Sequence, residues 1–199
     1  MESVPLPQQA SRAVRSRIDI VRSLVSSVIS RATSPKRFLD VASGPGRIER
    51  KVIDQLGSPH SAVHFDLVDA DADAIEYSRA LSLTKCHLAT PSSSITATHF
   101  VLRTISWHTM PFGVAVFFDY LDERRAVRLL AKMYSWLGEG GTMLIGNFAK
   151  ECTTQWIMEG LYGWSLIYRT NDECEQLCWP GIPSGSATLE QRRDVSTVL

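Results

Sequence analysis

The chain reads RFLDVASGPGR at residues 37–47, a stretch that predicts a short buried strand, a glycine turn and the start of a helix. The apolar run within residues 38–41 favours the strand. Gly44 and Gly46 allow backbone angles and close approaches that a Cβ atom would prevent, so a ligand can lie against bare backbone there. Apolar side chains recur at helical spacing over residues 47–56, and the first amides of that helix would point at whatever lies over the turn. This is the geometry of a nucleotide-type site.

Known nucleotide-binding turns place different demands on this stretch. A dinucleotide fingerprint needs a third glycine at position 49, but Glu49 stands there and places a carboxylate near the turn that would receive a pyrophosphate. A phosphate-binding P-loop needs a Gly-Lys-Ser/Thr tripeptide, and none follows the turn. An ordinary strand-to-helix loop is the alternative that the turn by itself leaves open.

The pattern that remains is an acid at the strand end, a small residue and two glycines: Asp40, Ala42, Gly44 and Gly46. It resembles the first motif of the class I S-adenosylmethionine-dependent methyltransferases. The resemblance implies that these residues bind S-adenosylmethionine. The family usually has glycine at the position of Ala42, and the alanine adds a methyl group that faces the ligand and crowds the site.

A second strand is predicted by the apolar residues of 63–68 and ends at Asp69. In a doubly wound nucleotide site the end of the second strand lies beside the first glycine turn, so an acid there can accept hydrogen bonds from a ribose diol. The stretch resembles the second motif of the same family, which implies that Asp69 binds the ribose and that the next residues border the adenine. Asp71 is a candidate for that second role, or the N-cap of the helix that follows.

The fold class that follows is α/β, a doubly wound and mostly parallel Rossmann-like sheet of the class I methyltransferase type. We expect one domain whose parts are a disordered N-terminus, a helix, a cofactor-binding core, and a lid with the C-terminal segment (residues 1–10, 11–31, 37–148 and 149–199).

Net charge, hydrophobic runs and cysteine spacing limit the kinds of partner that the protein is expected to bind. The 199 residues carry 21 basic and 21 acidic side chains, and this zero net charge argues against a nucleic-acid footprint. No apolar run is long enough to span a membrane, and the N-terminus lacks the order of a secretory signal, so a cytoplasmic protein is expected. The scattered cysteines, with Cys174 and Cys178 lacking a second pair, indicate free thiols and no metal site.

The sequence departs from the family after the third predicted strand, residues 95–102. The family usually carries an acid just past this strand, which binds the adenine amino group. Here Thr104 or Ser106 would have to substitute with a hydroxyl, and His108 is expected to be a loop histidine.

The fourth predicted strand, residues 113–118, is apolar throughout and ends at Asp119 and Tyr120. Because ligands lie outside the carboxyl ends of strands near the reversal of strand order, we expect both residues to face the same crevice as Asp40 and to line the reaction centre. A cap on the next helix is the alternative for Asp119.

Four further stretches narrow the resemblance to a subgroup: SRAVRSRI, FDYL, WLGEGGT and WSLIYR (residues 11–18, 118–121, 136–142 and 164–169). They resemble bacterial methyltransferases related to the enzyme that methylates the carboxyl group of a 3-hydroxy fatty acid. The resemblance implies a small-molecule methyl acceptor of the fatty-acid carboxylate type. Tyr168 and Arg169 are expected to be a packing residue and a surface cation rather than a carboxylate clamp.

Two other functions compete with an active methyltransferase. The protein could keep the fold and have lost the activity, which the alanine at position 42 and the missing adenine acid favour. A nicotinamide-dependent oxidoreductase is the less favoured alternative. Residues 195–199 also supply only the first half of the strand that closes the family's sheet, so an incomplete antiparallel hairpin is expected, with self-association through that edge as a consequence.

Overall fold

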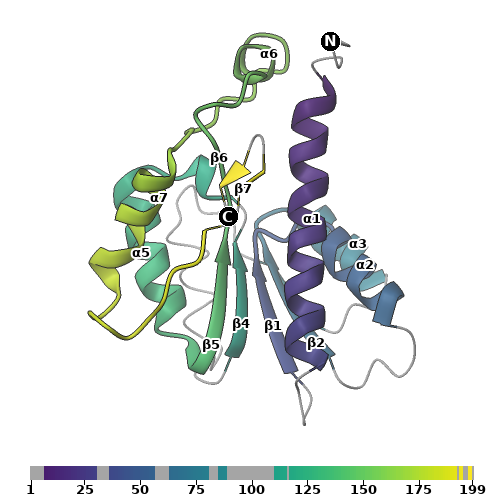
Figure 1. Cartoon of the computed structure of the whole chain (residues 1–199). Coiled ribbons are helices and arrows are strands. Elements are labelled where there is room, and N and C mark those ends of the chain that lie inside the picture. The colour runs from purple at the N-terminus through teal and green to yellow at the C-terminus, as the bar shows by residue number, and fades with distance from the viewer. Residues whose placement is uncertain are drawn as a thin grey trace. The chain divides into compact units, whose positions relative to one another are not determined.

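The computed structural model describes residues 7–30, 36–56, 63–80, 85–88, 110–115, 117–191, 193–194 and 197–198 (Figure 1). The third strand expected at residues 95–102, together with Thr104, Ser106 and His108, lies outside these ranges. The chain forms two compact units. The sheet unit contains Val21–Ala115 and Ser135–Leu144, and the helical unit contains Met1–Ile20, Val116–Tyr134 and Ile145–Leu199.

The sheet unit is built on five strands in the order β3-β2-β1-β4-β5. Their bounds are Lys85–Leu88 for β3, Val63–Asp69 for β2, Lys36–Val41 for β1, Met110–Ala115 for β4 and Leu137–Ile145 for β5. β1 pairs in parallel with both β2 and β4 (Figure 1). β2 also pairs in parallel with β3. The predicted parallel Rossmann-like sheet is therefore confirmed, and its strand order reverses at β1.

Helices follow the strands as the sequence predicts. α1 covers Pro7–Ser30 and begins four residues before the predicted start at residue 11, α2 covers Arg47–Leu56, and α3 covers Ala72–Ala80. β1 and β2 are buried through most of their length, and the rings of Phe38 and Phe65 lie 5.4 Å apart between centroids. The ends of these two strands are therefore held firmly beneath the turns that follow them.

The strand assignments differ from the prediction at β3 and β4, and also at β5, which was predicted at residues 142–148. Sequence analysis missed β3, whose four residues, KCHL, mix polar and apolar side chains without a strand pattern. It also extended β4 to residue 118, whereas β4 ends at Ala115 and Phe118–Tyr120 form the 3₁₀-helix η2. Ile167 donates its backbone N–H to the carbonyl of Asp119, so this backbone bonds to the segment around Ile167 instead of continuing a strand.

The helical unit packs α5 (Glu123–Tyr134) against α7 (Asn171–Cys178) and against the 3₁₀-helix η3 (Trp179–Gly181) (Figure 1). Its remaining elements are α6 (Gln155–Gly160), β6 (Asn147–Phe148), β7 (Arg193–Asp194) and β8 (Thr197–Val198). A Cβ atom at Gly181 would lie 2.3 Å from the Cβ of Ala131, so this close approach of η3 to α5 requires glycine.

Local signals in this unit behave as predicted. Thr170 and Glu173 form the expected capping box at the start of α7. Cys152, Cys174 and Cys178 are free and buried thiols, as expected. β8 pairs antiparallel with both β6 and β7, over two residue pairs each. An incomplete hairpin that leaves the sheet edge open for self-association stays a prediction.

Candidate cofactor site at the glycine turn

The turn after β1 is defined by its backbone angles. Ala42, Gly44 and Gly46 have φ values of 59°, 56° and 65°, all in the left-handed region. Ala42 also donates its N–H to the carbonyl of Val68 at 2.7 Å, which ties the turn to the end of β2. Glycine reaches this region freely, whereas alanine is strained there. The structure thus gives a backbone reason for the glycine that the methyltransferase motif usually has at the position of Ala42.

Asp69 connects the two motifs directly. Its Oδ2 accepts the N–H of Gly44 at 2.6 Å, and its Oδ1 accepts the N–H of Asp71 at 2.9 Å. A carboxylate has about four acceptor positions, so two backbone bonds leave capacity for the hydroxyl groups of a ligand. The structure therefore brings Asp69 beside the glycine turn, as the spacing of the two motifs predicted.

Asp71 is the N-cap of α3. Its Oδ1 accepts the backbone N–H of Asp73 at 3.0 Å and that of Ala74 at 3.3 Å, and its side chain is exposed. The capping alternative is therefore the one that the contacts support. A role beside the adenine stays a prediction.

A pair of buried acids lies on either side of the turn. Asp40, at the end of β1, and Glu49, in the first turn of α2, are each 2% exposed, and their carboxyl groups lie close enough to interact. Burial is the main reason why the pKa of Asp40 is raised well above its usual value, and the negative charges of Glu49 and Asp69 act in the same direction. Burial also raises the pKa of Glu49.

Sequence analysis missed this pairing. Glu49 entered the prediction only as an obstacle to a dinucleotide pyrophosphate. The available signal was helical spacing: Glu49 lies three positions before Val52 and four before Ile53, on the face of α2 that the apolar residues define. An acid on the buried face of a helix needs a hydrogen-bonding partner, and Asp40 is that partner.

Comparison with solved structures identifies the fold. A S-adenosylmethionine-dependent methyltransferase from Archaeoglobus fulgidus matches with a TM-score of 0.58 and 14% identity, over 80% of this chain and 66% of that one. The CurJ carbon methyltransferase matches with a TM-score of 0.62 and 10% identity, over 91% and 52% of the two chains. The fold is that of the class I methyltransferases.

This fold also occurs in a possible exported protein from Bordetella parapertussis, which matches with a TM-score of 0.66 and 14% identity over 99% of this chain and 69% of that one. The chain spans about half to two thirds of the length of these three structures. No family model matches the sequence, and no curated protein matches it.

Asp119 and Tyr120, which follow β4, are predicted to line the side of the site that binds the methyl acceptor. Asp119 and Tyr120 both lie on η2, but their side chains differ in environment, since Asp119 is 1% exposed and Tyr120 is 52% exposed. The hydroxyl of Tyr120 accepts a hydrogen bond from the indole of Trp164. Asp122 caps α5, since its Oδ1 accepts the N–H of Arg125 at 2.8 Å. That Asp119 also caps this helix stays a prediction. That Asp119 and Tyr120 face the cofactor stays a prediction.

Arg169 is buried, so its assignment as a surface cation is wrong. It is 5% exposed and donates to the carbonyls of Phe118 and Leu121 and to Oδ1 of Asn147. Burial lowers the pKa of its guanidinium, and nearby negative charges, Asp119 among them, oppose that shift. Arg169 therefore holds both ends of η2 in place.

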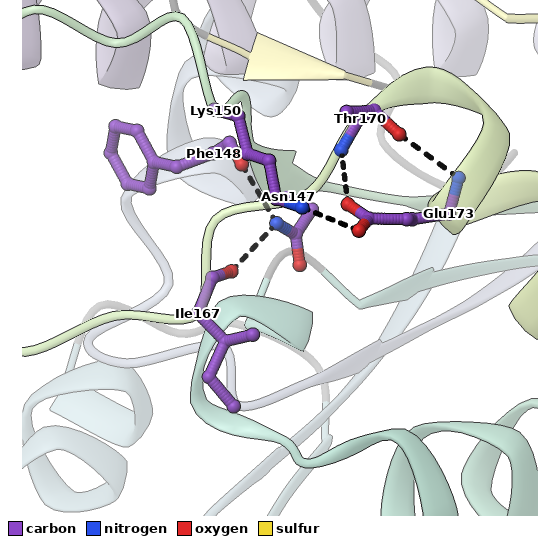
Figure 2. A network of polar contacts seen from close by, with 6 residues as sticks. All are labelled: Asn147, Phe148, Lys150, Ile167, Thr170 and Glu173. Carbon is purple, nitrogen blue, oxygen red and sulfur yellow. Dashed lines mark hydrogen bonds and ion pairs between the residues drawn. The ribbon is translucent and has the colours of Figure 1, made fainter.

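Asn147 completes this network (Figure 2). Its Nδ2 donates to the carbonyls of Phe148 at 2.8 Å and Ile167 at 2.9 Å. Figure 2 also shows the neighbouring ion pair of Lys150 with Glu173. Tyr168 packs against Phe148 in the adjacent apolar cluster, which agrees with its predicted packing role.

The described part of the chain has neither a membrane-spanning helix nor a cluster of metal ligands. None of its helices is long and apolar enough to cross a membrane. None of its groups of histidine, cysteine and acidic residues could hold a metal ion.

Proposed function

We propose that this protein transfers a methyl group from S-adenosylmethionine to a small molecule. The observation that carries the proposal is the hydrogen bond from the N–H of Gly44 to Asp69, which joins the turn of the first motif to the acid of the second. In this proposal the backbone at Ala42, Gly44 and Gly46 lies against the cofactor. Asp69 binds the ribose, with Asp40 and Asp71 at the two sides of the site.

The charge of the site fits this cofactor better than a dinucleotide. The carboxyl groups of Asp40, Glu49 and Asp69 interact around one turn. S-adenosylmethionine carries a positive sulfonium and an ammonium group, whereas a nicotinamide dinucleotide would bring a pyrophosphate with two negative charges toward these acids. Like charges at close range repel by several kcal/mol at low effective dielectric constant. A nicotinamide oxidoreductase is therefore the weaker alternative.

The cofactor supplies a methyl group on a good leaving group, so the protein mainly has to hold acceptor and methyl in line. For the acceptor we propose a carboxylate with an apolar chain, of the fatty-acid type. A carboxylate is already a nucleophile at neutral pH, and the burial of Asp119 gives η2 no accessible carboxylate base. The apolar side chains of Trp156, Leu161 and Tyr162 are 63–74% exposed, which supports an acceptor with an apolar chain.

Loss of activity in a retained fold is the second candidate. It is favoured by the left-handed angle of Ala42, because a strained alanine at this position is a departure from the family's usual glycine. A protein of this kind could still bind the cofactor without transferring its methyl group. A binding measurement would distinguish it from a protein that no longer binds the cofactor.

Calorimetry with S-adenosylmethionine and with NAD tests the proposal. We expect binding of the first and none of the second. Asp69→Ala should weaken cofactor binding by about 1.5–3 kcal/mol, or about ten- to 150-fold in Kd, because it removes hydrogen bonds to a charged group. Asp73→Asn, an exposed acid of the same helix region, is the matched control and should leave Kd unchanged. Equal affinity in wild type and Asp69→Ala would refute the placement of the ribose, and heat with NAD alone would favour the oxidoreductase.

A further inference from the structure

The acids beneath the glycine turn need a proton to bond to each other. Two ionised carboxylates contain acceptors only, so the buried and interacting carboxyl groups of Asp40 and Glu49 can bond to each other only if one of them is protonated. Among the described residues, no donor reaches Oδ1 of Asp40 or Oε2 of Glu49. Both side chains are nonetheless buried to within 2% of full burial.

In the neighbouring strands β2 and β4, no positively charged group is left to neutralise this pair. Asp69 on β2 adds a third negative charge and spends two acceptor positions on the backbone of Gly44 and Asp71. The other buried acid of β2, Asp66, pairs with Arg37 at 2.7 Å. β4, the other neighbour of β1, has the sequence MPFGVA and no titratable side chain. Within these elements the pair therefore experiences acids and apolar groups, which favour retention of the proton.

A cation at the turn would reverse this balance. A positive charge within a few ångströms stabilises carboxylates, and stabilising them releases the proton that they share. Oδ1 of Asp40 and Oε2 of Glu49, which accept no hydrogen bond from the described part of the chain, would then interact with the positive charge of that cation. In this way the charge that the proton supplies in the empty protein would be supplied by the ligand instead.

We infer that Asp40 and Glu49 share one proton beneath the glycine turn, and that a cationic ligand bound at the turn releases it to solvent. Glu49 is then a positioning residue that links binding of the ligand to pH, through Asp40. This inference rests on the proposed function, since the cation is the sulfonium cofactor. The exchange changes no covalent bond of the ligand: one proton leaves the carboxyl pair and one positive charge takes its place.

The test counts protons during binding. Titration of the protein with S-adenosylmethionine in two buffers of different ionisation enthalpy gives the number of protons released. We expect wild type to release up to about one proton more than Glu49→Gln, because glutamine keeps the hydrogen bond but has no proton to lose. Affinity of wild type should then rise up to about tenfold per pH unit while the pair titrates, and that of Glu49→Gln should stay nearly flat.

Asp54→Asn is the matched control, since Asp54 is an exposed acid on the same helix that pairs with Arg50. It should behave as wild type in both measurements. S-adenosylhomocysteine, which lacks the sulfonium charge, should release fewer protons than S-adenosylmethionine. Equal proton release and equal pH dependence in wild type and Glu49→Gln would overturn the inference.

The empty protein gives an independent measurement. Because the carboxyl pair keeps a proton in the folded state that the unfolded chain loses, the contribution of the pair to stability is fully present at low pH and falls as the pH rises above the usual carboxyl pKa. The melting temperature of wild type should therefore decline relative to that of Glu49→Gln over that range. A constant difference at all pH values would refute proton sharing. Absence of any binding heat, with this decline present, would instead refute the proposed function and the ligand-driven step.

Discussion

Two opposite substitutions, Ala42→Gly and Gly44→Ala, test whether the backbone of the glycine turn is strained. Both residues are left-handed, with φ values of 59° and 56°. A left-handed conformation costs a non-glycine residue about 1–2 kcal/mol, and Ala42→Gly removes that cost. Glycine also gives the unfolded chain more freedom, which offsets about 0.4–1 kcal/mol. Ala42 is exposed, so loss of its methyl group sacrifices little burial, and the expected net gain is about 0.5–1 kcal/mol.

Gly44→Ala should have the opposite sign. A Cβ atom at Gly44 would meet no heavy atom within 4 Å, so the change introduces backbone strain without a steric clash. We expect a loss of about 0.5–1 kcal/mol by the same two terms. For a chain of this length, thermal melts should show Ala42→Gly about 1–4 °C above wild type and Gly44→Ala about 1–4 °C below it. A lower melting temperature for Ala42→Gly, or a higher one for Gly44→Ala, would refute the assigned turn geometry.

Three further predictions concern the helical unit. Arg169→Met should destabilise the protein by about 3–5 kcal/mol, because it leaves buried carbonyls without a donor and removes a cation near Asp119. Urea unfolding measures this loss of stability. A loss below about 1 kcal/mol would contradict the role given to Arg169. Thr170→Ala should cost about 1 kcal/mol in the same assay, since it removes the capping box of α7, and an unchanged midpoint would show that the cap is dispensable. Tyr120→Phe should change methyl transfer more than cofactor affinity, as measured by turnover and by calorimetry; equal effects on both would remove Tyr120 from the acceptor side.

Much of the sheet unit could be predicted from sequence because its signals are local. An apolar strand, a turn with glycines and a helix with apolar spacing follow one another within residues 36–56, and the structure has them in that order. The placement of Asp69 beside Gly44 was also predictable, since parallel strands that are neighbours bring their carboxyl ends together.

Two features of the chain were harder to predict. β4 reads as a continuous apolar run through residue 118, and nothing in that run signals its end at Ala115. The end is associated with bonds from Ile167 and Arg169, which are about fifty residues away in sequence. Arg169 was predicted to be exposed because arginines are seldom buried without partners, and its partners are carbonyls and an amide that no sequence pattern marks.

The sequence by itself determined the strand, turn and helix at residues 37–56, the acid at the end of β2 and the capping box at Thr170, because each depends on residues a few positions apart. Only the tertiary structure decided that Glu49 faces Asp40 and that Arg169 holds η2. A buried charge is stable only with specific hydrogen-bonding partners, and these partners come from segments that folding alone brings together.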